Sequence, residues 1–286
     1  MLNMKTINDV VCVQGIPEGN KSGMSVNIFL TDGMLVDTGA QILLQELIPF
    51  FESADFDLVA LTHYHEDHTG GAAWIQEHRN VPIYIHPMSL DVCAKDAEYP
   101  DYRRVFWGDR DAFKAQPLGS VVQSRTQTWE PIFTPGHARD HMVYLNHSNG
   151  MLFSGDLYVT PKTKLVLREE SVPVIIDSIR RLLQYDFQEV FCCHAGYVQN
   201  GKEMFEKKLD YLENLRGEIL RLHNQGLEVH EIQQSVLPNR YPLIEISGHE
   251  WDSEHIITSI LKEDKGLKEE SDRNGLRNKD NTGASL

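Results

Sequence analysis

Long apolar runs, cysteines and positive charge are all scarce in this chain of 286 residues. No apolar run approaches the roughly 20 residues that a membrane-spanning helix needs, so we expect no membrane segment. The N-terminus has no basic stretch followed by a long apolar one, which argues against a secretory signal peptide. None of the four cysteines belongs to a C-x-x-C pair, so we expect reduced thiols and a cytoplasmic protein. They are Cys12, Cys93, Cys192 and Cys193.

The shortage of positive charge bears on the partners of the protein. The chain has 27 lysines and arginines against 42 aspartates and glutamates, a formal net charge of −15. Nucleic-acid binding depends on a basic surface, so we expect no nucleic-acid partner. Apolar residues make up 41% of the chain, which is enough for a sizeable core. This composition excludes a collagenous, coiled-coil or wholly disordered protein.

The sequence pattern divides the chain into three stretches. Residues 1–200 alternate strand-like runs with helical ones, an order that favours a layered α/β fold. Residues 201–261 are predicted to be helical, and the longest helix, over 202–223, has an apolar residue every three or four positions. Residues 262–286 have four apolar residues and no period, so we predict a disordered tail.

Individual elements follow from the same patterns. Strands are predicted over 10–13, 25–30, 34–36, 57–61, 83–85, 130–133, 142–145, 150–154 and 189–193. Besides 202–223, helices are predicted over 41–52, 69–78, 89–97, 172–183, 229–237 and 253–261. Residues 87–130 are irregular and rich in aromatic residues, so we interpret them as an insertion.

A run of potential metal ligands follows the predicted strand 57–61. It reads T-H-Y-H-E-D-H over residues 62–68. In an extended turn, residues i and i+2 share a face, so His63 and His65 can point the same way. Asp67 and His68 then stand at the start of the next helix, where a loop can turn them toward a second ion. Imidazole and carboxylate together suit zinc, and also iron or manganese.

Further candidates follow later strands, as two metal sites would require. His137 comes after the strand 130–133, Asp156 after 150–154, and His194 after 189–193. Each stands beside a glycine, or one residue from it, which permits a tight backbone turn. Active sites in layered α/β folds gather at the ends of strands, so we expect these residues to meet.

With these residues the chain resembles the metallo-β-lactamase-fold superfamily over roughly residues 10–200. The family motif H-x-H-x-D-H matches residues 63–68, the later His, Asp and His match in order, and Asp37 matches the family's early Asp. The resemblance implies a four-layer αβ/βα sandwich, here with a helical C-terminal appendage. It also implies two divalent ions, with zinc favoured and iron or manganese as alternatives. The implied ligands are His63, His65 and His137 for the first ion, Asp67, His68 and His194 for the second, and Asp156 for both.

The resemblance also implies the reaction. Two divalent ions hold a bridging hydroxide near neutral pH, and this hydroxide attacks a carbonyl group. Asp67 would orient it and Asp156 would hold both ions, so we assign catalytic roles to both carboxylates. Asp156 stands where the B1 β-lactamases have a Cys ligand, and this position resembles the glyoxalase II and lactonase branches. We therefore expect cleavage of an ester, thioester or lactone in a small-molecule substrate.

Residues that support the ligands or contact the substrate are less sharply indicated. Asp37 and His141 are expected to hold the ligands by hydrogen bonds. Candidate substrate contacts are Tyr158, Lys162 and Lys164, and also His249 in a glycine-containing loop. The competing interpretations are a solvated loop for the lysines and a capping or packing role for His249. For the aromatic residues of the insertion, a pocket wall and a homodimer contact both stay open.

Three other functions remain open on the sequence. A phosphodiesterase would use the same ions and bind phosphate through Lys162, Lys164 and Arg168. A sulfur dioxygenase of this fold would use one iron held by two His and an Asp. A non-catalytic scaffold would keep the fold alone, but it has no need of a complete ligand set.

Overall fold

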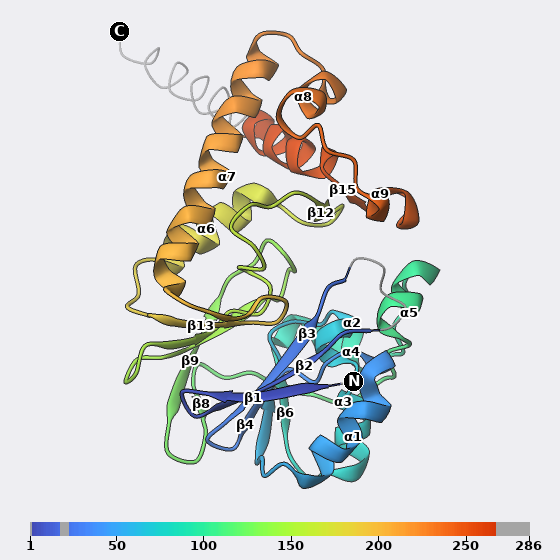
Figure 1. The fold of residues 1–286 in the computed structure, drawn as a ribbon, viewed down its shortest axis with the longest axis vertical. Coiled ribbons are helices and arrows are strands. Elements are labelled where there is room, and N and C mark those ends of the chain that lie inside the picture. The colour runs from blue at the N-terminus through green and yellow to red at the C-terminus, as the bar shows by residue number, and fades with distance from the viewer. Residues whose placement is uncertain (1, 18–22, 267–286) are drawn as a thin grey trace, which may run out of the picture.

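Strands from the two halves of the chain form separate sheets in the computed structural model, which describes residues 2–17 and 23–266 (Figure 1). Among the described residues, the first sheet has seven strands in the order β1 to β7. These are β1 (Asn3–Ile7), β2 (Val10–Gly15), β3 (Val26–Thr31), β4 (Met34–Val36), β5 (Leu58–Ala60), β6 (Ile83–Ile85) and β7 (Gln116–Pro117). Pairing is antiparallel from β1 to β4 and parallel from β4 to β7.

The second sheet has six strands within the described residues, in the order β14-β13-β11-β10-β9-β8. They are β8 (Val122–Gln123), β9 (Thr128–Phe133), β10 (Met142–Asn146), β11 (Met151–Phe153), β13 (Glu189–Cys192) and β14 (Gly196–Val198). A separate ribbon pairs β12 (Val166–Leu167) with β15 (Trp251–Asp252), and thus joins the loop after β11 to the C-terminal helices.

Three buried clusters define the layers. Phe29 of the first sheet packs on Phe153 and Phe191 of the second, with ring centroids 5.5 Å apart in both pairs, so the sheets lie face to face. The outer face of the first sheet is covered by α1 (Leu44–Ser53) and α3 (Ala72–His78). The outer face of the second sheet is covered by α6 (Val172–Leu182) and α7 (Gly201–Asn224). This is the expected four-layer αβ/βα sandwich.

The remaining helices connect or cover these layers. They are η1 (Gln41–Leu43), α2 (Glu66–Thr69), η2 (Pro87–Ser89), α4 (Leu90–Cys93), α5 (Asp101–Trp107), α8 (Val229–Val236) and α9 (Pro242–Ile246). A final helix covers 254–266. Among the described residues, no helix is both long enough and apolar enough to cross a membrane.

Every predicted strand and most predicted helices are present, with ends shifted by a few residues. Two predictions are wrong in extent. The helix over 89–97 ends at Cys93, and the helix over 69–78 is broken at Gly70 and Gly71. At the break the chain passes close to the backbone of Gln41, with which a side chain at Gly70 would collide.

The last helix extends into the segment predicted to be a disordered tail. Residues 262–266, assigned to the tail by the sequence pattern, continue this helix, and 267–286 lie outside the described residues. The division of the chain into domains stays a prediction.

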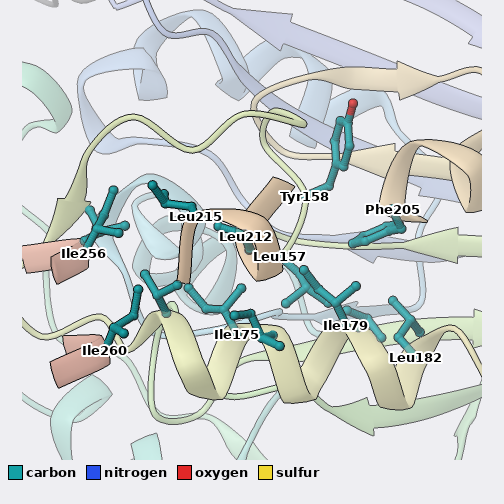
Figure 2. Packing of buried hydrophobic residues seen from close by; sticks show 14 of the residues in the cluster. Leu157, Tyr158, Ile175, Ile179, Leu182, Phe205, Leu212, Leu215, Ile256 and Ile260 are labelled. Atoms are coloured by element: carbon teal, nitrogen blue, oxygen red, sulfur yellow. The ribbon is translucent and has the colours of Figure 1, made fainter. Parts of the chain in front are cut away.

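The largest buried cluster joins α6 and α7 to the second sheet. Figure 2 shows Ile175 and Ile179 of α6 on the side of that helix that faces Leu212 of α7. Phe205 lies in the same cluster and is fully buried, with its ring 5.8 Å from that of Phe187. This cluster holds the C-terminal helices on the sandwich.

Replacing Phe205 with Ala tests that conclusion. Removal of a buried ring leaves a cavity and should lower the free energy of unfolding by about 3–5 kcal/mol. Glu206→Ala, next to it and exposed, should change it by less than about 0.5 kcal/mol. Urea unfolding followed by circular dichroism measures both, and equal effects of the two variants would contradict the assignment.

Candidate metal centre

The structure brings the seven predicted ligands together at the edge where both sheets end. His63 and His65 follow β5, and Asp67 and His68 lie in α2. His137 follows β9, while Asp156 and His194 follow β11 and β13. The ligands thus come from loops at the carboxyl ends of strands in both sheets. All seven are largely buried.

Three ring nitrogens face one another in the first group. Nδ1 of His65 lies 3.1 Å from Nε2 of His63 and 3.1 Å from Nε2 of His137. The other nitrogen of His137, Nδ1, lies 3.1 Å from Oε2 of Glu170, to which it can donate its proton. Its Nε2 then presents a lone pair to the group, as a metal ligand must. The three nitrogens lie close enough to share one ion.

The second group contains the imidazoles of His68 and His194, the carboxylate of Asp156 and the thiol of Cys193, and the carboxylate of Asp67 lies beside it. Nε2 of His194 lies 3.3 Å from Oδ2 of Asp67 and 3.0 Å from Oδ2 of Asp156. Nε2 of His68 lies 3.5 Å from Oδ1 of Asp156. Because Oδ2 of Asp156 is also 3.6 Å from Nε2 of His137, this carboxylate lies between the two groups.

Hydrogen bonds on the far side of the rings orient the second group. Nδ1 of His68 donates to Oδ2 of Asp37 at 2.8 Å, and Nδ1 of His194 donates to the carbonyl oxygen of Ser25 at 2.8 Å. Both rings therefore turn Nε2 toward the centre. Asp37 also accepts from the backbone N–H of Thr62, so it ties His68 to the loop that carries His63.

Two buried atoms test whether cations fit this centre. Nε2 of His68 and Oδ1 of Asp156 have no hydrogen-bond partner in the part of the chain that the structure describes. Buried polar atoms are normally satisfied, so these two call for an explanation. A cation between them would satisfy both, and the donor set of imidazole and carboxylate is one that zinc, iron and manganese accept.

The electrostatics of the centre differ between its two groups. Burial would lower the pKa of His68 and His194, but Cys193 and the neighbouring carboxylates outweigh it and raise that pKa well above its usual value. Burial would raise the pKa of Asp156, but His194 and His68 outweigh it and hold that pKa well below its usual range. Burial and the nearby imidazoles lower the pKa of His63 and His65 well below the usual value. The carboxylate is thus held ionised and these two imidazoles neutral, the states in which they bind metal.

His141 supports Asp156, as the sequence predicts. Its Nε2 accepts from the backbone N–H of Asp156 at 3.0 Å, and its Nδ1 lies 2.9 Å from Oγ1 of Thr134. Gly155 makes this contact possible, because its φ is +47° and a Cβ there would lie 2.6 Å from Nε2 of His141. A side chain at Gly155 would displace the carboxylate that joins the two groups.

A cavity of about 520 Å³ opens from the centre. His137, Asp156 and His194 line one end, and much of the wall is apolar, including residues of α9. Lys164, a predicted substrate contact, also lines it. The chemistry of this space is therefore a metal-ligand set beside an apolar chamber.

Three predicted substrate contacts do not line this cavity. The Tyr158 ring is buried against Phe205, with centroids 5.4 Å apart. Lys162 points to a smaller cavity beside α8. The side chain of His249 is 53% exposed and pairs with Asp252 at 2.8 Å, so it stabilises its own turn. The structure thus places these three side chains away from this cavity, and their contact with a substrate stays a prediction.

Several residues at the centre have no signal in the local sequence. Glu170 pairs with His137 from the far side, and the Trp107 ring lies 6.2 Å from that of His194. Phe106 lines the cavity, so one aromatic residue of the insertion does serve as pocket wall. Cys193 lies within the second group, although the sequence favours it as a plain core residue. The homodimer stays a prediction.

Comparisons with known proteins agree with this geometry. Residues 24–194 match the family model described as the metallo-beta-lactamase superfamily. The probable metallo-hydrolase YybB of Bacillus subtilis is 31% identical over 169 residues, which cover 54% of this chain and 76% of that protein. A hydroxyacylglutathione hydrolase of Cyanothece is 32% identical over 157 residues, covering 52% of this chain and 54% of that protein.

A solved structure matches the whole arrangement of elements. It is a metallo-beta-lactamase family protein from Thermus thermophilus, with a TM-score of 0.65 and 17% sequence identity. The match covers 93% of this chain and 95% of the other. At this identity the likeness shows the fold alone, C-terminal helices included.

Replacing Asp37 with Asn tests the support of His68. The amide keeps the size of the side chain but weakens the bond that directs Nε2 of His68 inward. Loss of such a partner typically lowers metal affinity by about 10–100-fold. Competition with a chromogenic chelator measures the affinity, and Asp177→Asn, an exposed carboxylate on α6, is the control. Unchanged affinity in Asp37→Asn would refute the role.

Proposed function

We propose that this protein holds two divalent ions and cleaves an ester, thioester or lactone. The proposal starts from its family, because the chain belongs to the metallo-beta-lactamase superfamily and is a metal-dependent hydrolase. One observation carries the proposal: two groups of buried ligand atoms lie side by side, with the Asp156 carboxylate between them. With a single ion, the ligand atoms of the second group would be buried with no ion to bind. This favours two ions over the single iron of a sulfur dioxygenase.

The ligand assignment is part of the proposal. His63, His65 and His137 would hold the first ion, and Asp156 would bridge both; Asp67, His68 and His194 would complete the second site. Zinc fits this set best, because nitrogen-rich sites with a few carboxylates suit it. When bound, the ions would supply an activated water and polarise the carbonyl oxygen of the substrate.

The side chains of the protein would orient the attacking water and keep bulk water out of the site. Burial opposes the ionised form of Asp67, but His68 and His194 outweigh it and lower the pKa, so the carboxylate is charged. It would therefore accept a hydrogen bond from the attacking water and direct it toward the carbonyl carbon. Trp107 and Met24 border the centre and would limit the entry of bulk water.

The cavity supports a small-molecule carbonyl substrate. Its largely apolar wall suits an acyl group, and one relative is named for the hydrolysis of a hydroxyacylglutathione. Lys164 at the wall favours one second candidate, a small phosphodiester, because an ammonium group binds phosphate. The four free, buried cysteines support the expectation of a cytoplasmic enzyme.

Metal content and a substrate panel test the proposal. Protein purified without tag or chelator should contain about two zinc ions per chain by mass spectrometry of the metals. It should turn over thioesters, aryl esters or lactones faster than bis(4-nitrophenyl) phosphate, whereas the reverse order would favour the phosphodiesterase. One iron per chain, with no second ion on titration, would refute the two-ion proposal.

Replacing Asp156 with Ala tests the bridging role. Both groups lose a shared ligand, so we expect about one ion per chain instead of two, and a fall in kcat of at least about a thousandfold. Asp177→Ala on α6 should keep both ions and full activity. Two tightly bound ions and normal turnover in Asp156→Ala would show that this carboxylate holds neither.

A further inference from the structure

One charged side chain in the cavity wall has no role in the proposed reaction. Glu170 lines the cavity but pairs with His137, and Lys164 is exposed to solvent. Lys208 of α7 differs from both. It lines the same cavity as Asp156 and His194, yet it is only 5% exposed.

The ammonium group of Lys208 is incompletely satisfied. It has three N–H donors, and among the described residues one acceptor is recorded, the carbonyl oxygen of Tyr158 at 2.6 Å. No carboxylate in the described part of the chain forms an ion pair with it. Buried charges are normally paired, because transfer from water to the interior is costly.

Lys208 keeps its positive charge at neutral pH in spite of its burial. Burial lowers the pKa of its amine to about 8, while the neighbouring Cys192, Glu170 and Asp156 act in the opposite direction. At neutral pH most molecules therefore carry the ammonium form. A positive charge faces an otherwise largely apolar chamber, with two of its donors left over.

The hydrogen bond of Lys208 also determines where the ammonium lies. Its acceptor, Tyr158, stands two residues after Asp156, and the next residue, Val159, has a φ of +50°. That backbone conformation is rare for a β-branched residue, so this segment is held rather than free. The segment, with Leu157, Val159 and Thr160 in the wall, links the metal-ligand end of the cavity to Lys208.

We infer that the substrate carries, beyond its reacting carbonyl and an apolar body, a carboxylate that pairs with Lys208. The inference rests on the proposed hydrolysis for the position of the carbonyl, but it concerns the end of the molecule that does not react. The apolar wall accepts the body of the acyl group, and the carboxylate takes the free donors of the ammonium. The substrate class is thus an ester or thioester of an apolar acid that bears a second, anionic end.

Lys202 provides a matched control for a purely structural role of Lys208. It lies on the same helix, and its Nζ likewise donates to a backbone carbonyl, that of Tyr185, at 2.8 Å. It does not line the cavity. Lys208→Met and Lys202→Met therefore each remove an ammonium and one hydrogen bond to the backbone, but only the first removes charge from the chamber.

The first experiment compares paired substrates on the metal-loaded enzyme. Mono-4-nitrophenyl esters of diacids with four to ten carbons are compared with 4-nitrophenyl esters of monoacids of equal length. At the best length, the anionic ester should have at least about a tenfold higher kcat/KM, mainly through a lower KM, because a charge-assisted hydrogen bond is gained away from the reacting atoms. Lys208→Met should abolish this preference, Lys208→Arg should keep part of it, and Lys202→Met should keep all of it.

A second experiment separates this inference from the proposed function. Calorimetry on the same metal-loaded proteins compares the binding of 6-hydroxyhexanoate, 1,6-hexanediol and 6-hydroxyhexyl phosphate, so it needs no turnover. The inference predicts tighter binding of the carboxylate than of the diol, lost in Lys208→Met, even where no ester is cleaved. Tighter binding of the phosphate through Lys208 would overturn the choice of carboxylate.

Two results would overturn the inference altogether. One is the absence of any preference for anionic ligands in the wild-type protein, which needs no variant. The other is a preference that survives in folded Lys208→Met, since the carboxylate would then bind the metal ions directly. Thermal melting checks the fold. If Lys208→Met fails to fold, a smaller preference in Lys208→Arg than in Lys202→Met would support the inference, and an equal preference in the two variants would overturn it.

Discussion

The burial of a cluster of ionisable side chains between two sheets is the constraint on which the rest of this structure depends. Seven imidazole and carboxylate groups are buried close together, and the part of the chain that the structure describes leaves Nε2 of His68 and Oδ1 of Asp156 without partners. Such a cluster costs free energy unless opposite charges or ions satisfy it. The architecture around it serves to hold these groups in place.

The sandwich supplies that rigidity from two directions. Phe29, Phe153 and Phe191 lock the two sheets face to face, and so fix the distance between loops that come from different sheets. Behind the ligands, Asp37 holds the ring of His68 and His141 holds the backbone of Asp156, each by a buried hydrogen bond. A metal centre needs geometry accurate to a few tenths of an ångström, and packed elements provide this better than free loops do.

The C-terminal helices complete the site and do more than cover the core. α7 carries Lys208 into the cavity, α9 forms part of its outer wall, and the β12–β15 ribbon ties this region to the loop that follows Asp156. Two hydrogen bonds from Arg103 to Glu66, at 2.6 and 2.8 Å, link the insertion to α2 in a similar way. The cavity wall and the metal-ligand set therefore come from different parts of the chain.

Sequence reasoning succeeded where the signal is local. The strands and the long helix are present because their apolar residues repeat with the period of the element, and the motif over 62–68 was legible because its spacing is short. It failed for the helix over 89–97, which ends after Cys93. It could not place Tyr158, Lys162 and His249 relative to the cavity, which they do not line, since proximity in sequence to Asp156, or to a glycine, does not say which way a side chain points.

The sequence by itself determined the family, the layered fold and the set of side chains able to bind metal, because each is encoded by residue types at short, regular separations. Only the tertiary structure decided which charges share a cavity. Glu170 meets His137, and Lys208 meets the chamber beside Asp156, across 33 and 52 residues of chain respectively, as their positions show. Contacts of that range depend on how whole layers pack, so no local pattern announces them.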